Sequence, residues 1–148
     1  MTTTILRFSA AHNIGSKVIQ IATWGDYSHV DFETPEGKWL GARFVGGVDE
    51  REPYEVARYI RFEVPDAPTS VLERLRTQLH RPYDYLALVG FVARQDWRID
   101  DSWICSELMA WAFEQENFPL LRGDRFNRIT PRDLMLSTRL RFLDKWGV

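Results

Sequence analysis

The sequence predicts an α+β domain in which a small antiparallel sheet packs against helices. Strand-like patterns lie near the front and middle of the chain and helix-like patterns follow them, which is the order expected for this class. Pro35 and Gly37 form a turn signal between two alternating stretches, which predicts an antiparallel hairpin. With 148 residues, 45% hydrophobic and 27% charged, the chain fits a single domain, residues 1–148, large enough for a core without disulfides.

The strands are predicted from alternation and β-prone composition. In chain order they cover 4–8, 27–33, 38–44, 57–64 and 139–145. Residues 17–23 fit either a strand or a helical turn. The segments 9–16, 46–56 and 95–102 are predicted to be loops that shape any pocket.

The helices are predicted from apolar spacing and end signals. They cover 70–79, 84–94, 105–117 and 132–136. Ser70 and Glu73 have the spacing of a capping box, Asp84 is a candidate N-cap, and Thr130 followed by Pro131 reads as an N-cap and first helical residue.

Composition excludes several classes of function. The formal charge of −2, without a Lys/Arg cluster, does not favour nucleic acid as a partner. One cysteine and three scattered histidines predict no disulfide, no metal site and no cofactor. The apolar run 85–93 is about half of what a membrane span needs, so no transmembrane segment is expected. The start lacks a signal-peptide pattern, which predicts a cytoplasmic protein unless lysis or a dedicated system exports it.

Cys105 is the candidate nucleophile because it lies at the predicted first turn of a helix. Backbone N–H groups and the helix dipole favour a thiolate there. The alternative is that a lone cysteine is simply a small buried hydrophobe. A thiolate also needs a histidine that moves protons. His29 lies on a strand predicted to be central and is the best candidate, whereas His12 lies in a predicted loop and His80 at a predicted helix end.

Three segments together resemble the circularly permuted branch of the NlpC-like papain-fold superfamily. They are Ser28-His29-Val30 before a hairpin, Tyr83-Asp84-Tyr85, and Trp103-Ile104-Cys105-Ser106-Glu107-Leu108. That branch includes bacterial permuted amidases and hydrolases and the lecithin:retinol acyltransferase-like proteins. The resemblance covers about residues 17–136 and implies a barrel-like sheet in permuted papain-like order, with the His strand before the Cys helix.

The resemblance implies that Cys105 is the nucleophile and His29 the general base. The family's third, orienting group falls at Gly41, which has no side chain. Asp31, on the same face of its strand as His29, and Gln20 are candidates to replace it, as are a backbone carbonyl or a water molecule. Tyr83 and Asp84 match a motif near the cysteine, as substrate contacts or as a packed ring and a helix cap.

The implied function is a bacterial or phage cysteine hydrolase that cleaves an amide, thioester or ester bond through an acyl-enzyme. A peptide, peptidoglycan or an acylated small molecule would be its substrate. One alternative is an inactive binding or structural module of a phage or secretion apparatus, which the missing group at Gly41 favours. The other is an acyltransferase.

Overall fold

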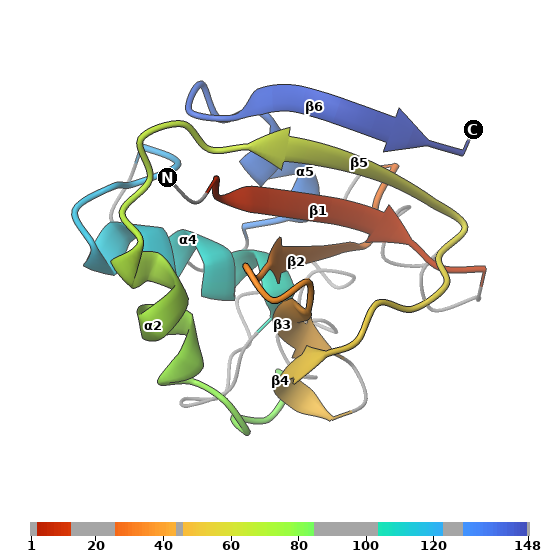
Figure 1. Cartoon of the computed structure of the whole chain (residues 1–148), viewed down its shortest axis with the longest axis horizontal. Coiled ribbons are helices and arrows are strands. Elements are labelled where there is room, and N and C mark those ends of the chain that lie inside the picture. Colours follow the sequence, from red (N-terminus) through yellow and green to blue (C-terminus); the bar gives the residue numbers. More distant parts are fainter. Residues whose placement is uncertain (1–2, 13–25, 44–45, 85–103, 123–128, 148) are drawn as a thin grey trace.

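A six-stranded antiparallel sheet forms the body of the protein. The computed structural model describes residues 3–12, 26–43, 46–84, 104–122 and 129–147. The strands are β1 (Ile5–Ala10), β2 (His29–Glu33), β3 (Trp39–Arg43), β4 (Gly47–Arg51), β5 (Arg58–Glu63) and β6 (Arg141–Trp146). They lie in the order β4-β3-β2-β1-β5-β6, so the N-terminal strand is central and the C-terminal strand forms one edge (Figure 1).

Most predicted strands are confirmed, and one was missed. The hairpin joins β2 to β3, with Gly37 at φ +83° in its turn, and 57–64 and 139–145 correspond to β5 and β6. Residues 47–51, predicted to be loop, form β4 along the whole of β3. Asp49 and Glu50 have low strand propensity, so the sequence did not predict this strand. In the fold their side chains pair with arginines on neighbouring elements.

The predicted fold class is wrong. The described strands form one open sheet whose edges, β4 and β6, are separated by four other strands. It does not close into the barrel-like sheet expected from the resemblance, and the described chain is dominated by the sheet with three short helices. Alternation along a strand identifies the face that is buried, but it contains no information on whether two distant edges meet.

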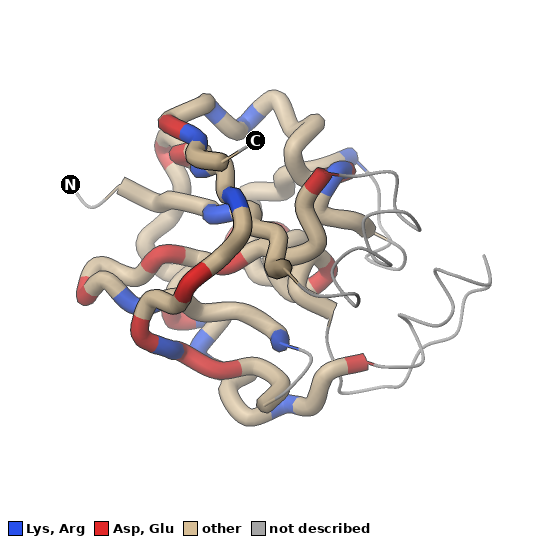
Figure 2. Tube along the Cα trace, turned by 90° about the vertical axis from the view of Figure 1, so that its right-hand side faces the viewer, with Lys and Arg blue, Asp and Glu red and all other residues tan. Residues whose placement is uncertain are grey.

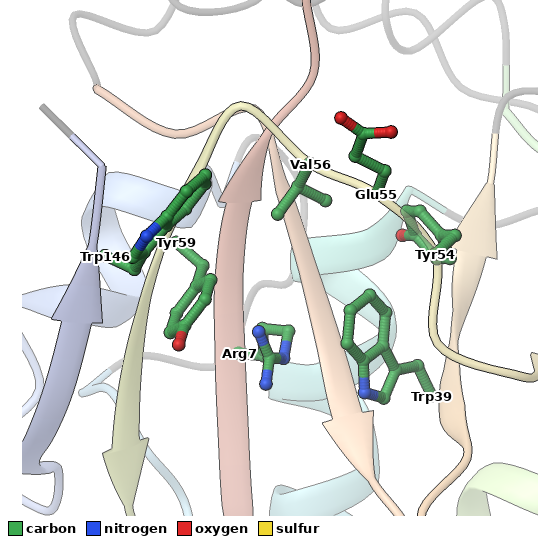
Figure 3. Close-up of a pocket in the computed structure, with 7 residues that line it drawn as sticks. All are labelled: Arg7, Trp39, Tyr54, Glu55, Val56, Tyr59 and Trp146. Carbon is green, nitrogen blue, oxygen red and sulfur yellow. The ribbon is translucent and has the colours of Figure 1, made fainter.

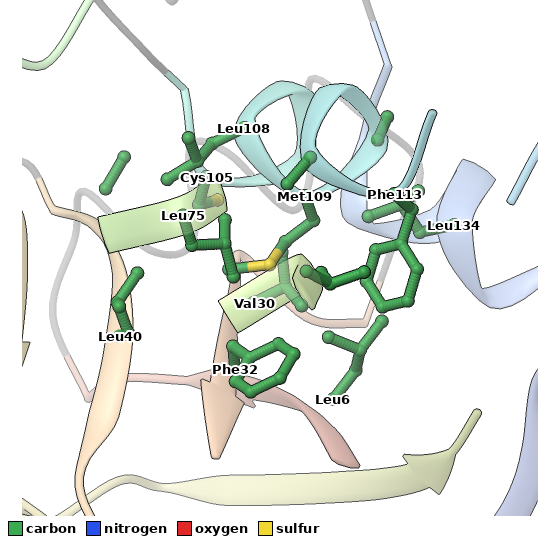
Figure 4. Packing of buried hydrophobic residues seen from close by; sticks show 14 of the residues in the cluster. Leu6, Val30, Phe32, Leu40, Leu75, Cys105, Leu108, Met109, Phe113 and Leu134 are labelled. Atoms are coloured by element: carbon green, nitrogen blue, oxygen red, sulfur yellow. The ribbon is translucent and has the colours of Figure 1, made fainter. Parts of the chain in front are cut away.

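The core lies between one sheet face and the helices α2 (Ser70–Arg76), α4 (Cys105–Gln115) and α5 (Pro131–Met135). In α4, Leu108, Met109 and Phe113 recur at helical spacing and are completely buried. They pack over apolar side chains of the central strands, including Val30 and Phe32 (Figure 4). This packing fixes α4, and therefore its first residue, against β2 and β3.

The ends of the helices agree only in part with the sequence. Thr130 and Asp133 form a capping box before Pro131, so the predicted start of α5 is confirmed. The capping box predicted from Ser70 and Glu73 is wrong. Thr69, not Ser70, is the N-cap of α2, and it makes no side-chain cap. The Ser70 hydroxyl donates to Glu116 after α4. A tertiary contact has replaced the local one.

Charged residues of opposite sign lie close together over much of the described chain (Figure 2). On the sheet face turned away from the helices, Glu33 accepts from both Arg7 and Arg61, and Arg61 also pairs with Asp144. These pairs tie β1, β2, β5 and β6 together across the sheet. None of the helices in the described part of the chain has the length and apolar character that crossing a membrane requires.

Candidate active site

Side chains along β2 alternate between the apolar core and the opposite side of the strand, where the polar residues lie. Val30 and Phe32 are buried in the core beneath the helices, so His29 and Asp31 share the other side of the strand. Their side chains meet directly, with His29 Nε2 2.9 Å from Asp31 Oδ1. A neighbour two residues away on the same strand therefore does reach the imidazole.

Asp31 is completely buried and accepts from three side chains. Oδ1 accepts from His29 and from Arg43 Nη2 at 3.0 Å, and Oδ2 accepts from the Tyr54 hydroxyl at 2.9 Å. Burial raises the pKa of Asp31, but the His29 and Arg43 charges and the hydrogen bonds from His29 and Tyr54 outweigh it, and the pKa is lowered. The carboxylate is therefore ionised and held in one orientation.

Gly41 makes room for this carboxylate. A Cβ atom built on Gly41 would lie 2.3 Å from Asp31 Oδ1 and 3.0 Å from the Val30 carbonyl oxygen. Any side chain at position 41 would therefore collide with the group that contacts His29. The carboxylate beside His29 therefore comes from Asp31 of β2 and not from β3. Gly41, at the position of the expected third group, leaves the space that this carboxylate fills.

The imidazole of His29 is influenced by both Asp31 and Cys105. Burial is the largest influence and by itself lowers the pKa of His29. The charges of Asp31 and Cys105 and hydrogen bonds to both outweigh burial and raise the pKa from 6.5 to about 10. Cys105, 76 positions away in sequence, is thus near enough to help raise the pKa of His29, which lies well above neutral pH.

Cys105 is the first residue of α4 and is 2% exposed. Ile104 before it is extended, with φ −94° and ψ 147°, so the chain enters the helix abruptly at the cysteine. The next residue, Ser106, donates to the Ile129 carbonyl oxygen at 2.5 Å and ties the start of α4 to the segment before α5. The first N–H groups of a helix have no carbonyl partner within it, so this end can receive negative charge.

The other predicted residues occupy varied positions. Tyr83 belongs to the same buried cluster as Cys105, and Asp84 is completely buried. Gln20 and the predicted helix beyond Asp84 lie outside the described residues. His12 and His80 are exposed, and the structure places neither in contact with Cys105 in the described part of the chain.

Sequence reasoning missed Arg43 and Tyr54. Arg43 lies two residues after Gly41 and therefore on the face of β3 that adjoins Asp31, so the alternation of β3 could have identified it. It also binds the Asp49 carboxylate of β4 and the Trp39 carbonyl oxygen. Tyr54 lies in the connection after β4, where no periodic pattern exists, so nothing in the sequence indicated its contact with Asp31.

The pKa values predict how stability depends on pH. His29, whose pKa is raised, stabilises the folded state fully below about pH 6.5, and this stabilisation is lost as the pH rises to about 10. Asp31, whose pKa is lowered, stabilises the folded state above about pH 3.8, and this stabilisation is lost as the pH falls further. In urea unfolding, His29→Gln should cost most stability between about pH 4 and 6.5 and progressively less toward pH 10. A cost independent of pH would contradict the ion pair.

The fold is similar to that of a solved structure. This is the crystal structure of the metalloprotein yiiX from Escherichia coli O157:H7, a DUF1105 protein, with a TM-score of 0.71 and 16% identity over 99% of this chain and 98% of that chain. At this identity the likeness concerns the fold alone. No group of three or more His, Cys, Asp or Glu among the described residues could hold a metal ion. No protein-family model matches the chain, and no curated protein matches its sequence.

Proposed function

We propose that this chain is a cysteine hydrolase that cleaves an amide, thioester or ester bond through an acyl-enzyme. Cys105 is the nucleophile, His29 moves the proton, and Asp31 orients and charges the imidazole. The observation that carries the proposal is that His29 Nε2 lies 2.9 Å from the Asp31 carboxylate while Cys105 helps to raise the pKa of the same imidazole. This is the arrangement of nucleophile, base and orienting acid used in acyl transfer.

In the proposed mechanism Cys105 acts as a thiolate beside a protonated His29, whose pKa is raised. Because Nε2 is bound to Asp31, Nδ1 is the ring nitrogen left for the thiolate. The thiolate attacks the carbonyl carbon, and the imidazolium gives its proton to the leaving amine, thiol or alcohol. Neutral His29 then removes a proton from water, the hydroxide attacks the thioester, and Cys105 leaves as thiolate beside the reprotonated imidazolium.

The start of α4 is suited to hold the oxyanion of each tetrahedral intermediate. The N–H of Cys105 itself lies at the first helical position, beside the nucleophile, and the helix dipole adds positive potential there. The Ser106 bond to the Ile129 carbonyl oxygen and the packing of α4 hold these donors in place. Fixed donors stabilise developing charge without reorganising at the moment of reaction.

The motifs that resemble the permuted NlpC-like hydrolases support the same chemistry and extend the proposal to an amide of a peptide or of peptidoglycan. The alternative of an inactive module depended on the missing group at Gly41. Asp31 occupies that space, so this argument for inactivity loses its basis. An acyltransferase would use the same acyl-enzyme and pass it to an acceptor other than water.

Alkylation of Cys105 by iodoacetamide tests the ion pair directly, because only the thiolate reacts and the chain has one cysteine. We expect the rate at about pH 6 to remain close to its value at pH 8, whereas a free thiol with a pKa of about 8.5 slows by about 100-fold over this range. Intact mass spectrometry gives the rate at each pH.

Two variants complete this experiment. His29→Gln should restore the steep pH dependence of an ordinary thiol, and His12→Ala, which changes an exposed histidine, should leave the profile unchanged. The proposal fails if the native protein already shows the profile of a free thiol, or if His29→Gln does not alter it.

A further inference from the structure

The sheet face turned away from the helices carries an open pocket of about 380 Å³ (Figure 3). Four aromatic residues, Trp39, Tyr54, Tyr59 and Trp146, surround Arg7, and Glu55 stands at the rim. The volume lies within the range of small-molecule sites, about 300 to 1,000 Å³. These residues come from four strands and the connection after β4, so the pocket exists only in the assembled sheet.

Two aromatic pairs form the walls. Tyr59 and Trp146 are stacked, with ring centroids 6.1 Å apart and planes 24° apart. On the other side of Arg7, Trp39 and Tyr54 meet edge to face at 4.8 Å. Trp146 is 56% exposed although it is a large apolar side chain. Aromatic surface that is gathered around a pocket and left open to solvent is typical of a site where a ligand stacks.

Arg7 provides a fixed positive group between the walls. Its guanidinium carbon lies 4.3 Å from the ring centroids of both Trp39 and Tyr59, and the residue is 9% exposed. Its Nε donates to Glu33 Oε1 at 2.7 Å. Among the described residues its two terminal amino groups have no hydrogen-bond acceptor, although Asp144 lies near enough for the Arg7 charge to lower the pKa of that carboxyl. A clamped guanidinium binds a planar carboxylate with little loss of side-chain entropy.

We propose that this pocket binds a small organic monoanion, with its carboxylate on the Arg7 amino groups and an aromatic or flat apolar body against the exposed rings of Trp146 and Tyr54. Glu33 and Glu55 lie close by, so a single negative charge is favoured over a doubly charged phosphate. The site needs no chemistry from Cys105. It adjoins the candidate active site, because the Tyr54 hydroxyl donates to Asp31, Arg7 is the cross-strand partner of Asp31, and Arg43 donates to the Trp39 carbonyl oxygen.

A matched ligand pair tests the role of the carboxylate without changing the protein. N-acetyl-L-phenylalanine carries the acid, and N-acetyl-L-phenylalaninamide replaces it with a neutral amide of nearly the same shape. Titration is followed by the indole N–H signals of Trp39 and Trp146 in ¹⁵N–¹H spectra. We expect the acid to shift both signals and to bind about 10-fold or more tightly than the amide. Equal binding, or no shift of these signals by the acid, overturns the proposal.

Variants then assign the contacts. Arg7→Gln should abolish the preference for acid over amide, and Trp146→Ala should weaken both ligands. Arg139→Gln is the matched control, because the Arg139 guanidinium lies 4.1 Å over the Phe118 ring outside this pocket. Cys105→Ala should bind the acid as the native protein does. If Arg7→Gln does not fold, the proposal is decided by the affinities of the native protein for the acid and the amide, together with those of Trp146→Ala. Tighter binding of phenyl phosphate than of the acid contradicts the assignment of a carboxylate ligand.

Discussion

Replacing Cys105 with alanine should abolish hydrolysis of p-nitrophenyl acetate above the uncatalysed rate. The thiolate forms the covalent bond in the proposed mechanism, and no other cysteine exists to replace it. Loss of a nucleophile or its base in such a unit lowers kcat by about 10⁴- to 10⁶-fold. His29→Gln should have an effect of the same order. The two changes together should cost little more than either alone, because the residues act as one unit.

The measurement is the release of nitrophenolate, with intact mass spectrometry to detect an acetylated Cys105. His12→Ala is the control, since this exposed histidine has no part in the site. An acetyl mass increase that accumulates in the native protein and is absent from Cys105→Ala would identify the acyl-enzyme. Hydrolysis that continues at the native rate in both Cys105→Ala and His29→Gln would falsify the assignment.

The second large effect is expected when the carboxylate of Asp31 on β2 is removed and replaced by one at position 41 on β3. Asp31→Ala should lower the rate of Cys105 acylation by about 10²- to 10⁴-fold, because the imidazole loses both its orienting partner and the charge that raises its pKa. Gly41→Asp alone should also fail, since its Cβ atom would lie 2.3 Å from Asp31 Oδ1. The double variant, Asp31→Ala with Gly41→Asp, places a carboxylate in the vacated space. It should recover about 10-fold or more of the rate lost in Asp31→Ala.

Gly41→Ala, combined with Asp31→Ala, is the matched control, because it fills the same space without a charge. Thermal unfolding of each variant separates packing from catalysis, since overpacking at a buried site costs about 1 to 3 kcal/mol. If the double variant with aspartate at position 41 is no faster than the one with alanine, the carboxylate does not act through His29. The role of Asp31 would then be structural.

Local patterns predicted much of the secondary structure. The hairpin around Gly37, the start of α4 at Cys105 and the cap of α5 at Thr130 each depend on residues close in sequence, and all three are confirmed. The same reasoning failed where a distant partner decided the outcome. The Ser70 hydroxyl bonds to Glu116 instead of capping its own helix, and residues 47–51 form a strand because β3 offers a free edge.

The sequence by itself identified the two candidate reactive residues, because a thiol at a helix start and a histidine on a strand are local features. Only the tertiary structure decided that the sheet is open, that His29 meets Cys105, and that Asp31 fills the space beside Gly41. Arg43 and Tyr54, which hold that carboxylate, also entered the site only through the fold. The reason is physical: helix and strand periods follow from the backbone, whereas the position of a buried charge depends on space and donors supplied by other strands.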